Sequence, residues 1–322
     1  MKRFVAMLVC ALVTTLHFVR GEEPNARTAL IVAVGAGGEK DYDESFAEWA
    51  EHWKKAAAAG DARLTVIDEA NGLDRLRAAL AQEPTASAAP LWLVLLGHGT
   101  FDGRDAKFNL RSEDLAASEL AALLKPFTRP VVVVAAFSAS GAFLAPLAAP
   151  NRIVITATKS GSENNFARLG RHLSQAIADP AADLDHDGQT SLLEAWLSAA
   201  QKVAEFYKSE GRLATEHSML DDNGDGRGTP ADWFQGIRIV KKTRDNALPD
   251  GLRAHQMHLV PGEAERALSP EIRARRDALE LELARLREAK ASLSEDEYFA
   301  KLETVLLGLA RIHRSAADPA KN

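Results

Sequence analysis

Five short apolar runs rich in β-branched residues constrain the fold of this 322-residue chain more than any other feature. They lie at residues 30–34, 64–67, 91–96, 131–135 and 152–156. Segments with apolar residues at helical spacing alternate with them, at residues 44–58, 73–81, 116–124 and 166–178. Buried strands that alternate with helices form parallel sheets with helices on both faces. The sequence therefore predicts an α/β fold with a mostly parallel sheet flanked by helices.

The first 21 residues have the pattern of a secretory signal peptide. Lys2 and Arg3 precede an apolar run that is too short to span a bilayer comfortably, and Gly21 is a candidate for the last residue before cleavage. The single cysteine, Cys10, lies inside this run, so the mature chain would have neither a disulfide nor a thiol nucleophile. We therefore expect an exported protein, periplasmic or secreted, without a transmembrane segment after cleavage.

The charge balance argues against nucleic-acid binding. The formal net charge is -6 at pH 7, and residues 1–21 contain Lys2, Arg3 and Arg20 but no acidic residue, so cleavage would make the chain more acidic. Non-specific nucleic-acid binding needs clustered Lys and Arg side chains that displace counterions from phosphates. We expect cations, and no nucleic acid, among the partners.

Two of the predicted strands are followed by polar residues that would meet at one edge of the sheet. Gly97, His98 and Gly99 follow the run at 91–96, and the segment from Ser138 to Gly141 follows the run at 131–135. Loops that leave the carboxyl ends of neighbouring parallel strands converge on one crevice. We therefore expect His98 and Ser138 to lie close together.

In these two segments the chain resembles the caspase-like peptidases of the legumain (C13) type. Members of that family place a His-Gly after one strand and an Ala-Cys-x-Ser-Gly-type segment after the next, and here Ser138 stands where the catalytic cysteine would be. The resemblance covers roughly residues 28–240 by the order of elements. It implies a caspase-like fold with His98 and Ser138 at the catalytic positions. A further segment is similar to one that helps to build the specificity pocket of legumain-like members, which implies a substrate contact for Glu163.

The serine leaves two functions open. A cysteine thiol is partly ionised near neutral pH, whereas a serine hydroxyl needs an oriented general base, and the sequence offers only the nearby Asp102 to orient His98. One hypothesis is a homologue that is defective in cysteine-type proteolysis and acts as a peptide-binding or regulatory protein, with Ser138 as a turn residue and His98 holding a loop. The alternative is an active peptidase or other hydrolase that uses a His98/Ser138 dyad.

Residues 183–194 match the calcium loop of EF-hand proteins. Carboxylates, a backbone carbonyl and a glycine that permits a sharp turn occur at the required positions. The predicted ligands are Asp183, Asp185, Asp187, Gln189 through its carbonyl, and Glu194 as a bidentate carboxylate. Because Pro180 interrupts the preceding segment, we expect a single loop followed by one helix, over residues 191–209. The alternative is an acidic loop whose Asp residues only cap that helix.

A second loop, residues 221–232, repeats part of this pattern. Its predicted ligands are Asp221, Asn223, Asp225 and Asp232. The match is poorer because Pro230 and the flanking residues do not have a helical pattern. Calcium is therefore the expected cofactor, with a role in stabilising the region beside the crevice.

The C-terminal region predicts a helical hairpin, or coiled coil, at residues 269–315, separate from an α/β domain at residues 22–262. Ser294 and Glu297 form a capping-box pattern that would open its second helix. The first helix has an apolar seam with a period of seven and the second an apolar face: Ile272, Leu279, Leu286 and Leu293, then Phe299, Leu302, Leu306 and Leu309. A third hypothesis gives this hairpin the main role, as a surface for homo-oligomerisation or for docking onto an envelope partner.

Overall fold

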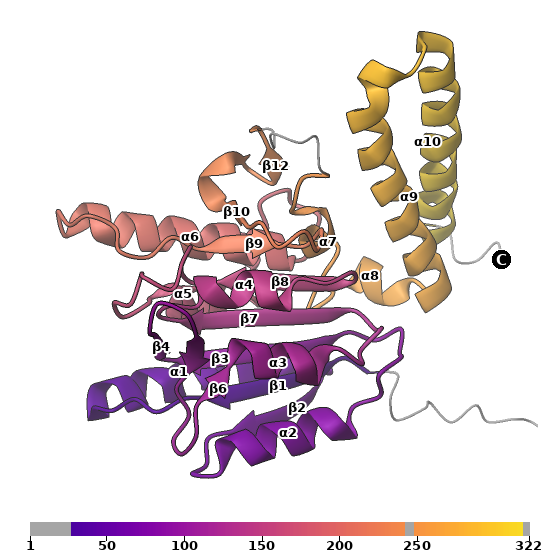
Figure 1. Ribbon diagram of the computed structural model, residues 1–322. Coiled ribbons are helices and arrows are strands. Elements are labelled where there is room, and N and C mark those ends of the chain that lie inside the picture. Colours follow the sequence, from indigo (N-terminus) through magenta and orange to yellow (C-terminus); the bar gives the residue numbers. More distant parts are fainter. Residues whose placement is uncertain (1–26, 242–247, 318–322) are drawn as a thin grey trace, which may run out of the picture.

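The computed structural model describes residues 27–241 and 248–317, so the predicted signal peptide lies outside the described residues. A seven-stranded sheet with the order β10-β9-β8-β7-β3-β1-β2 forms the centre of the molecule (Figure 1). Its strands are β1 (Ala29–Val34), β2 (Arg63–Ile67), β3 (Leu91–Gly97), β7 (Val131–Phe137), β8 (Arg152–Thr156), β9 (Met219–Asp221) and β10 (Thr229–Pro230). The first five are parallel to one another, whereas β9 is antiparallel to both β8 and β10. The predicted mostly parallel sheet is confirmed.

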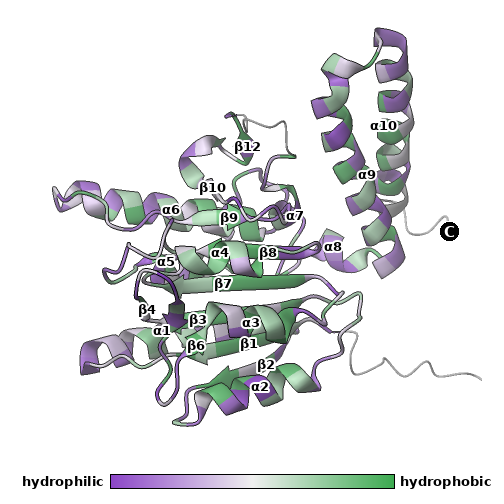
Figure 2. Cartoon of the chain, viewed as in Figure 1, coloured by the Kyte–Doolittle hydropathy of each residue, from purple (hydrophilic) through white to green (hydrophobic). Residues whose placement is uncertain are grey.

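Helices cover both faces of the sheet, so the molecule has three layers. On one face lie α1 (Lys40–Ala59), α5 (Leu169–Ala176) and α6 (Leu192–Ser209), and on the other α2 (Gly72–Gln82), α3 (Ala117–Leu124) and α4 (Gly141–Leu147). Alternate strand residues face opposite helix layers: Leu30 packs with the α1 layer and Ile31 with the α2 layer. Both faces are therefore buried at β1, β3, β7 and β8, which explains why these strands are almost entirely apolar in sequence (Figure 2).

The register of the central strands brings the two predicted site segments together. In the parallel pair β3·β7, Gly97 lies opposite Phe137. His98 and Ser138 are the next residues of their chains, so both leave the same edge of the sheet side by side.

Several short elements connect the main ones. They are β4 (Gly99–Phe101), β5 (Ala106–Phe108) and β6 (Leu115–Ala116) in a small antiparallel sheet, η1 (Pro180–Ala182), η2 (Ala231–Trp233), the pair β11 (Phe234–Gln235) and β12 (Arg238–Ile239), α7 (Leu252–His255) and α8 (Glu263–Ala267). These short elements were not predicted from the sequence, because segments of two to five residues are too short to establish a hydrophobic period.

The C-terminal segment forms the predicted helical hairpin, with α9 (Pro270–Glu288), η3 (Ala289–Ser292) and α10 (Glu295–Ala317) extending from the α/β body (Figure 1). The capping box is confirmed: the Ser294 hydroxyl accepts from the Glu297 amide, and the Glu297 carboxylate accepts from the Ser294 amide. No helix in the described part of the chain is long and apolar enough to cross a membrane.

Two details of the predicted hairpin packing are wrong. The first helix ends at Glu288, so Leu293 follows it in extended backbone and does not continue its seam. In α10 the side chains of Phe299 and Leu306 are 51% and 45% exposed, whereas Tyr298, Val305 and Ile312 are buried. The true seam keeps Leu302 and Leu309 but replaces Phe299 and Leu306 by their neighbours Tyr298 and Val305, and it continues to Ile312. Its residues alternate by four and three positions, as in a coiled-coil interface.

Candidate functional site

The hydroxyl of Ser138 is enclosed in the turn that follows β7. Its Oγ donates a hydrogen bond to the carbonyl of Gly99 and accepts one from the Gly99 amide, each at 3.1 Å. The residue is only 2% exposed. A side chain at position 99 would collide with the Ser138 carbonyl at 2.4 Å, so only glycine permits this approach. Ser138 therefore ties the exit of β7 to the exit of β3.

The imidazole of His98 faces the helix layer formed by α1 and α5. It makes edge contacts with the rings of Tyr42 and Phe46, at centroid distances of 4.9 and 5.2 Å, and lies 5.9 Å from the ring of Phe166. Burial lowers the pKa of His98, and a hydrogen bond to the Gly37 backbone partly offsets this. The imidazole is therefore neutral near pH 7 and is held by an aromatic cage.

The two residues are neighbours along the sheet edge, and their side chains make hydrogen bonds to other partners in the described structure. Within the described residues, the hydrogen bonds of the Ser138 hydroxyl go to Gly99 and that of the His98 ring to Gly37. Asp102 does not orient His98: its carboxylate accepts from the amides of Arg104 and Asp105 in the β4–β5 turn, and these bonds lower its pKa.

The turn after Ser138 is braced against the segment that follows β8. Ala139 has a φ of 62°, a left-handed conformation that costs a non-glycine residue about 1–3 kcal/mol unless its surroundings enforce it. Here the Ala139 amide donates to the Glu163 carbonyl at 2.8 Å. The buried Ser140 hydroxyl accepts from the amides of Ala157 and Thr158. Ser138 and Ser140 therefore both serve as links between strand exits.

Glu163, the residue implied as a substrate contact, is engaged with the protein. Its carboxylate accepts from the amides of Lys159 and His217 and contacts the imidazole of His217, and its side chain is 12% exposed. It lies next to the Ser138 turn, as the resemblance implies, because its own carbonyl holds Ala139. The substrate contact itself stays a prediction.

The loop at residues 183–194 gathers carboxylates before α6. Oxygen atoms of Asp183, Asp185 and Asp187 all lie within 4.8 Å of one another. Gly188 has a φ of 92°, which supplies the sharp turn expected at this position. The loop follows η1 rather than a long helix, so it is a single loop with one following helix, as expected.

A second group shares Asp185 with the first. Ligand atoms of Asp185, Glu194 and His255 lie within 4.8 Å of one another, and Nε2 of His255 is 3.1 Å from the Asp185 carboxylate. His255 comes from α7 and was not predicted, because nothing in its local sequence marks it as a partner of a loop seventy residues away.

The alternative interpretation of this loop, in which its Asp residues cap the helix, does not match the structure. Ser191 is the N-cap of α6, and it forms a capping box with Glu194. The Asp carboxylates instead accept from amides within the loop, such as those of Asp187 and Gly188. The predicted backbone ligand Gln189 uses its side chain to bridge Asp187 and the amide of Gly262.

The loop at residues 221–232 is organised differently. Asp221, Asn223 and Asp225 accept from loop amides, whereas the Asp232 carboxylate pairs with Lys241 at 2.7 Å. The loop is closed by Asp250, which accepts from the amides of Asp222 and Asn223 and from the Thr229 hydroxyl. Burial raises the pKa of Asp222 and of Asp250. Sequence analysis missed Asp250 because it lies outside the loop pattern.

Comparison with known proteins finds similarity among solved structures only. No protein-family model and no curated protein matches this sequence. Among solved structures, the chain is similar to the Drosophila initiator caspase Dronc, with a TM-score of 0.40 and 12% sequence identity over 70% of this chain and 96% of that one. A TM-score this low decides nothing about the reaction. The chain is an α/β protein whose mostly parallel sheet carries His98 and Ser138 at one edge.

Proposed function

We propose that the protein is an exported, calcium-binding caspase-like (C13-type) peptidase homologue that is defective in proteolysis and acts as a peptide-binding or regulatory protein. The observation that carries the proposal is the paired hydrogen bonding of Ser138 with Gly99. The caspase-like assignment rests on the Gly97-His98-Gly99 and Ser138-Ala139-Ser140-Gly141 segments at neighbouring strand ends.

The chemistry of acyl transfer supports the loss of activity. A serine nucleophile must be exposed to its substrate and must pass its proton to a base within hydrogen-bond reach. Ser138 is buried and donates its proton to a backbone carbonyl, and the imidazole of His98 is directed into an aromatic cage. Attack by Ser138 would require both side chains to leave these positions.

The test is hydrolysis of a broad fluorogenic peptide library by the mature chain in the presence of calcium. We expect no turnover above that of a His98→Ala, Ser138→Ala double variant. Turnover in the natural protein that is lost in each single alanine variant would instead establish the His98/Ser138 hydrolase. Far-UV circular dichroism should accompany Ser138→Ala, since loss of its two hydrogen bonds costs about 1–3 kcal/mol.

Substitution by cysteine tests whether position 138 corresponds to the nucleophile of a cysteine peptidase. Activity gained by Ser138→Cys would identify position 138 as a former nucleophile, because a thiolate needs less help from His98. Ser140→Cys is the matched control, since it places a thiol two residues away in the same buried turn. Equal activity in both cysteine variants would contradict a special role for position 138.

We infer that calcium is held by the loop at residues 183–194. The donors fit a hard divalent cation: the carboxylate oxygens of Asp183, Asp185 and Asp187 converge, and Glu194 is close to Asp185. When bound, the cation would neutralise these charges and fasten the loop to the start of α6. The clustered carboxylates repel one another without it, which favours occupancy.

Calorimetric titration of the chelator-treated protein with calcium tests this inference. We expect a dissociation constant of about 0.1–1 mM, the range of extracellular modules. Asp185→Asn should abolish binding at this loop, whereas Asp105→Asn, an exposed aspartate in the β4–β5 turn, should not. A second equivalent of calcium that is lost in Asp225→Asn would add the loop at 221–232. Identical titrations of the natural protein and Asp185→Asn would refute the first site.

A further inference from the structure

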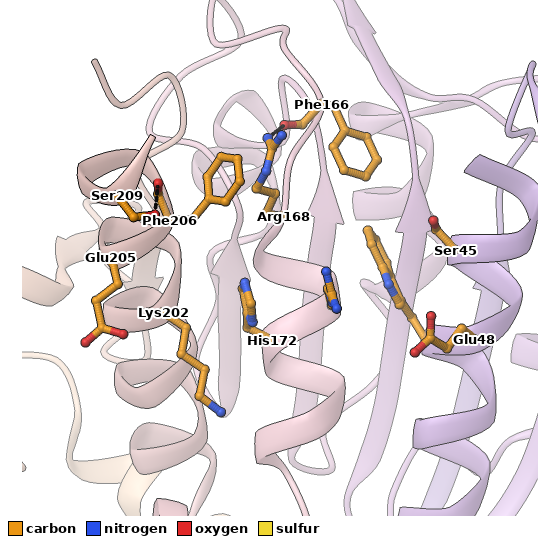
Figure 3. A pocket seen from close by; sticks show the side chains of 11 residues that line it. Ser45, Glu48, Phe166, Arg168, His172, Lys202, Glu205, Phe206 and Ser209 are labelled. Carbon is orange, nitrogen blue, oxygen red and sulfur yellow. Dashed lines mark hydrogen bonds between the residues drawn. The ribbon is translucent and has the colours of Figure 1, made fainter. Parts of the chain in front are cut away.

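A pocket of about 650 Å³ lies outside the Ser138 turn, among α1, α5 and α6 (Figure 3). Trp49, Phe166 and Phe206 give it apolar walls, and neither His98 nor Ser138 lines it. Figure 3 shows the Arg168 side chain rising between the rings of Phe166 and Phe206, with His172 and Lys202 on facing helices below it.

The pocket concentrates positive charge in an acidic protein. Arg168, Arg171 and Lys202 line it, and none of the three forms an ion pair with a side chain in residues 27–241 or 248–317. The lining also contains two acids, Glu48 and Glu205, and the Glu205 carboxylate accepts a hydrogen bond from Gln201. Three cations therefore face two carboxylates, and an excess of arginine and lysine in a concave site favours anion binding.

Arg168 is fixed in place before any ligand binds. Its guanidinium carbon lies 4.0 Å from the centroid of the Phe206 ring and 5.5 Å from that of Phe166, and Nη1 donates to the Phe166 carbonyl at 3.3 Å. A planar guanidinium stacked on an aromatic ring loses little freedom when it binds an anion, and its remaining donors can grip two oxygens.

The imidazole of His172 lies within the electrostatic field of the pocket's charged residues. Its Nδ1 is buried without a hydrogen-bond partner among the described residues. The pKa of His172 is lowered to about 4, first by burial and then by the charges of Arg171, Lys202 and Arg168, which Glu205 only partly offsets. A buried polar atom without a protein partner can accept a hydrogen bond from, or donate one to, a group that enters the pocket.

We propose that this pocket binds a small organic anion, with its carboxylate or phosphate held by Arg168, Arg171 and Lys202 and a flat apolar group set against the aromatic walls. The ligand site is distinct from the Ser138 turn, although Phe166 contacts both Arg168 and His98. Apolar walls with a few convergent charges are the usual composition of small-molecule sites.

Calorimetric titration of the whole mature protein with phenyl phosphate and with benzoate tests the proposal. We expect saturable binding of at least one, and the tighter of the two identifies the headgroup. Inorganic phosphate and benzyl alcohol, which each lack one half of the ligand, should bind at least about tenfold more weakly. Failure of both aromatic anions to bind would overturn the proposal.

Two lysines of one helix provide a matched pair of variants. Lys202→Gln should weaken binding by about tenfold, through loss of one charge-assisted hydrogen bond. Lys208→Gln, which removes an exposed lysine of α6 that does not line the pocket, should leave it unchanged. Equal affinity in the two variants would refute the proposal that Lys202 holds the carboxylate or phosphate of the ligand. Both lysines are at the surface, so neither variant should unfold the protein.

Nuclear magnetic resonance of His172 gives a second measurement. A bound anion should raise its pKa, because the anion offsets the three cations that face the ring. Other titratable groups in this region are Glu205 of α6 and Glu48 and His52 of α1. These residues are present both with and without the anion, so the difference between the two titrations reports the anion. An anion that binds but leaves the His172 titration unaltered has bound elsewhere, which would contradict the proposal.

Discussion

At the scale of single residues, the positions of His98 and Ser138 were predictable and the directions of their side chains were not. Two buried strands that are neighbours in a parallel sheet bring their following residues to one edge, and this is visible in the sequence. The bond between Ser138 and Gly99 depends on a close backbone approach that no local pattern encodes. The same limit hid His255 and Asp250, which reach their loops from distant segments.

Glu216 should make stability depend on pH. One carboxylate oxygen accepts from the amides of Arg168 and Leu169 at the start of α5, and the other is buried without a partner among the described residues. Burial raises the pKa of Glu216 to about 7 from a usual value of 4.5. Between these values the folded protein keeps a proton that the unfolded chain releases, so the free energy of unfolding should fall as pH rises from about 4.5 to about 7.

Urea unfolding across this pH range measures the effect. Glu216→Gln cannot titrate, so its free energy of unfolding should fall less with pH than that of the natural protein. Glu210→Gln, an exposed residue at the end of α6, should retain the full dependence. A pH slope that is the same in all three proteins would show that Glu216 is ionised in the fold.

At the scale of elements, the sequence predicted that α10 has an apolar stripe with helical spacing, but it placed two residues of that stripe one position too far along the chain. Leucines at 302 and 309 belong to the interface either way, and the choice lies between Phe299 with Leu306 and Tyr298 with Val305. The larger apolar residues favoured the first set in the sequence. Both sets alternate steps of three and four residues, so spacing alone cannot separate them. The structure selects the second, because it buries Tyr298 and Val305 and leaves Phe299 and Leu306 half-exposed.

Aspartate substitutions at adjacent positions test this phase. Val305→Asp would place a charge at a site that is 2% exposed and should destabilise the hairpin by about 3 kcal/mol or more. Leu306→Asp, at a 45% exposed site, should change stability little. Loss of helical circular dichroism on heating compares the two. Greater damage from Leu306→Asp would mean that Leu306, rather than Val305, faces α9.

Leu306→Asp also bears on assembly. The proposal that the hairpin mediates homo-oligomerisation has a natural surface in Phe299, Leu306 and Leu307, which are exposed. Sedimentation of the natural chain beside Leu306→Asp would reveal an assembly that depends on this face.

At the scale of the whole molecule, the layered α/β body followed from the sequence because four of its five parallel strands, β1, β3, β7 and β8, are buried along their whole length. The antiparallel strands β9 and β10 did not, since they contain three and two residues and pair only through the turn-rich segment around Asp221. The pocket among α1, α5 and α6 also escaped prediction. Its lining residues are separated by up to about 160 positions and meet only when three helices pack on one face of the sheet.

The paired hydrogen bonds between Ser138 and Gly99 also affect how the sheet edge can move. They close a ring between two strand exits, so the ends of β3 and β7 are coupled mechanically and cannot separate one at a time. Opening requires the edge to fray as a unit, which is a local unfolding event rather than a loop fluctuation.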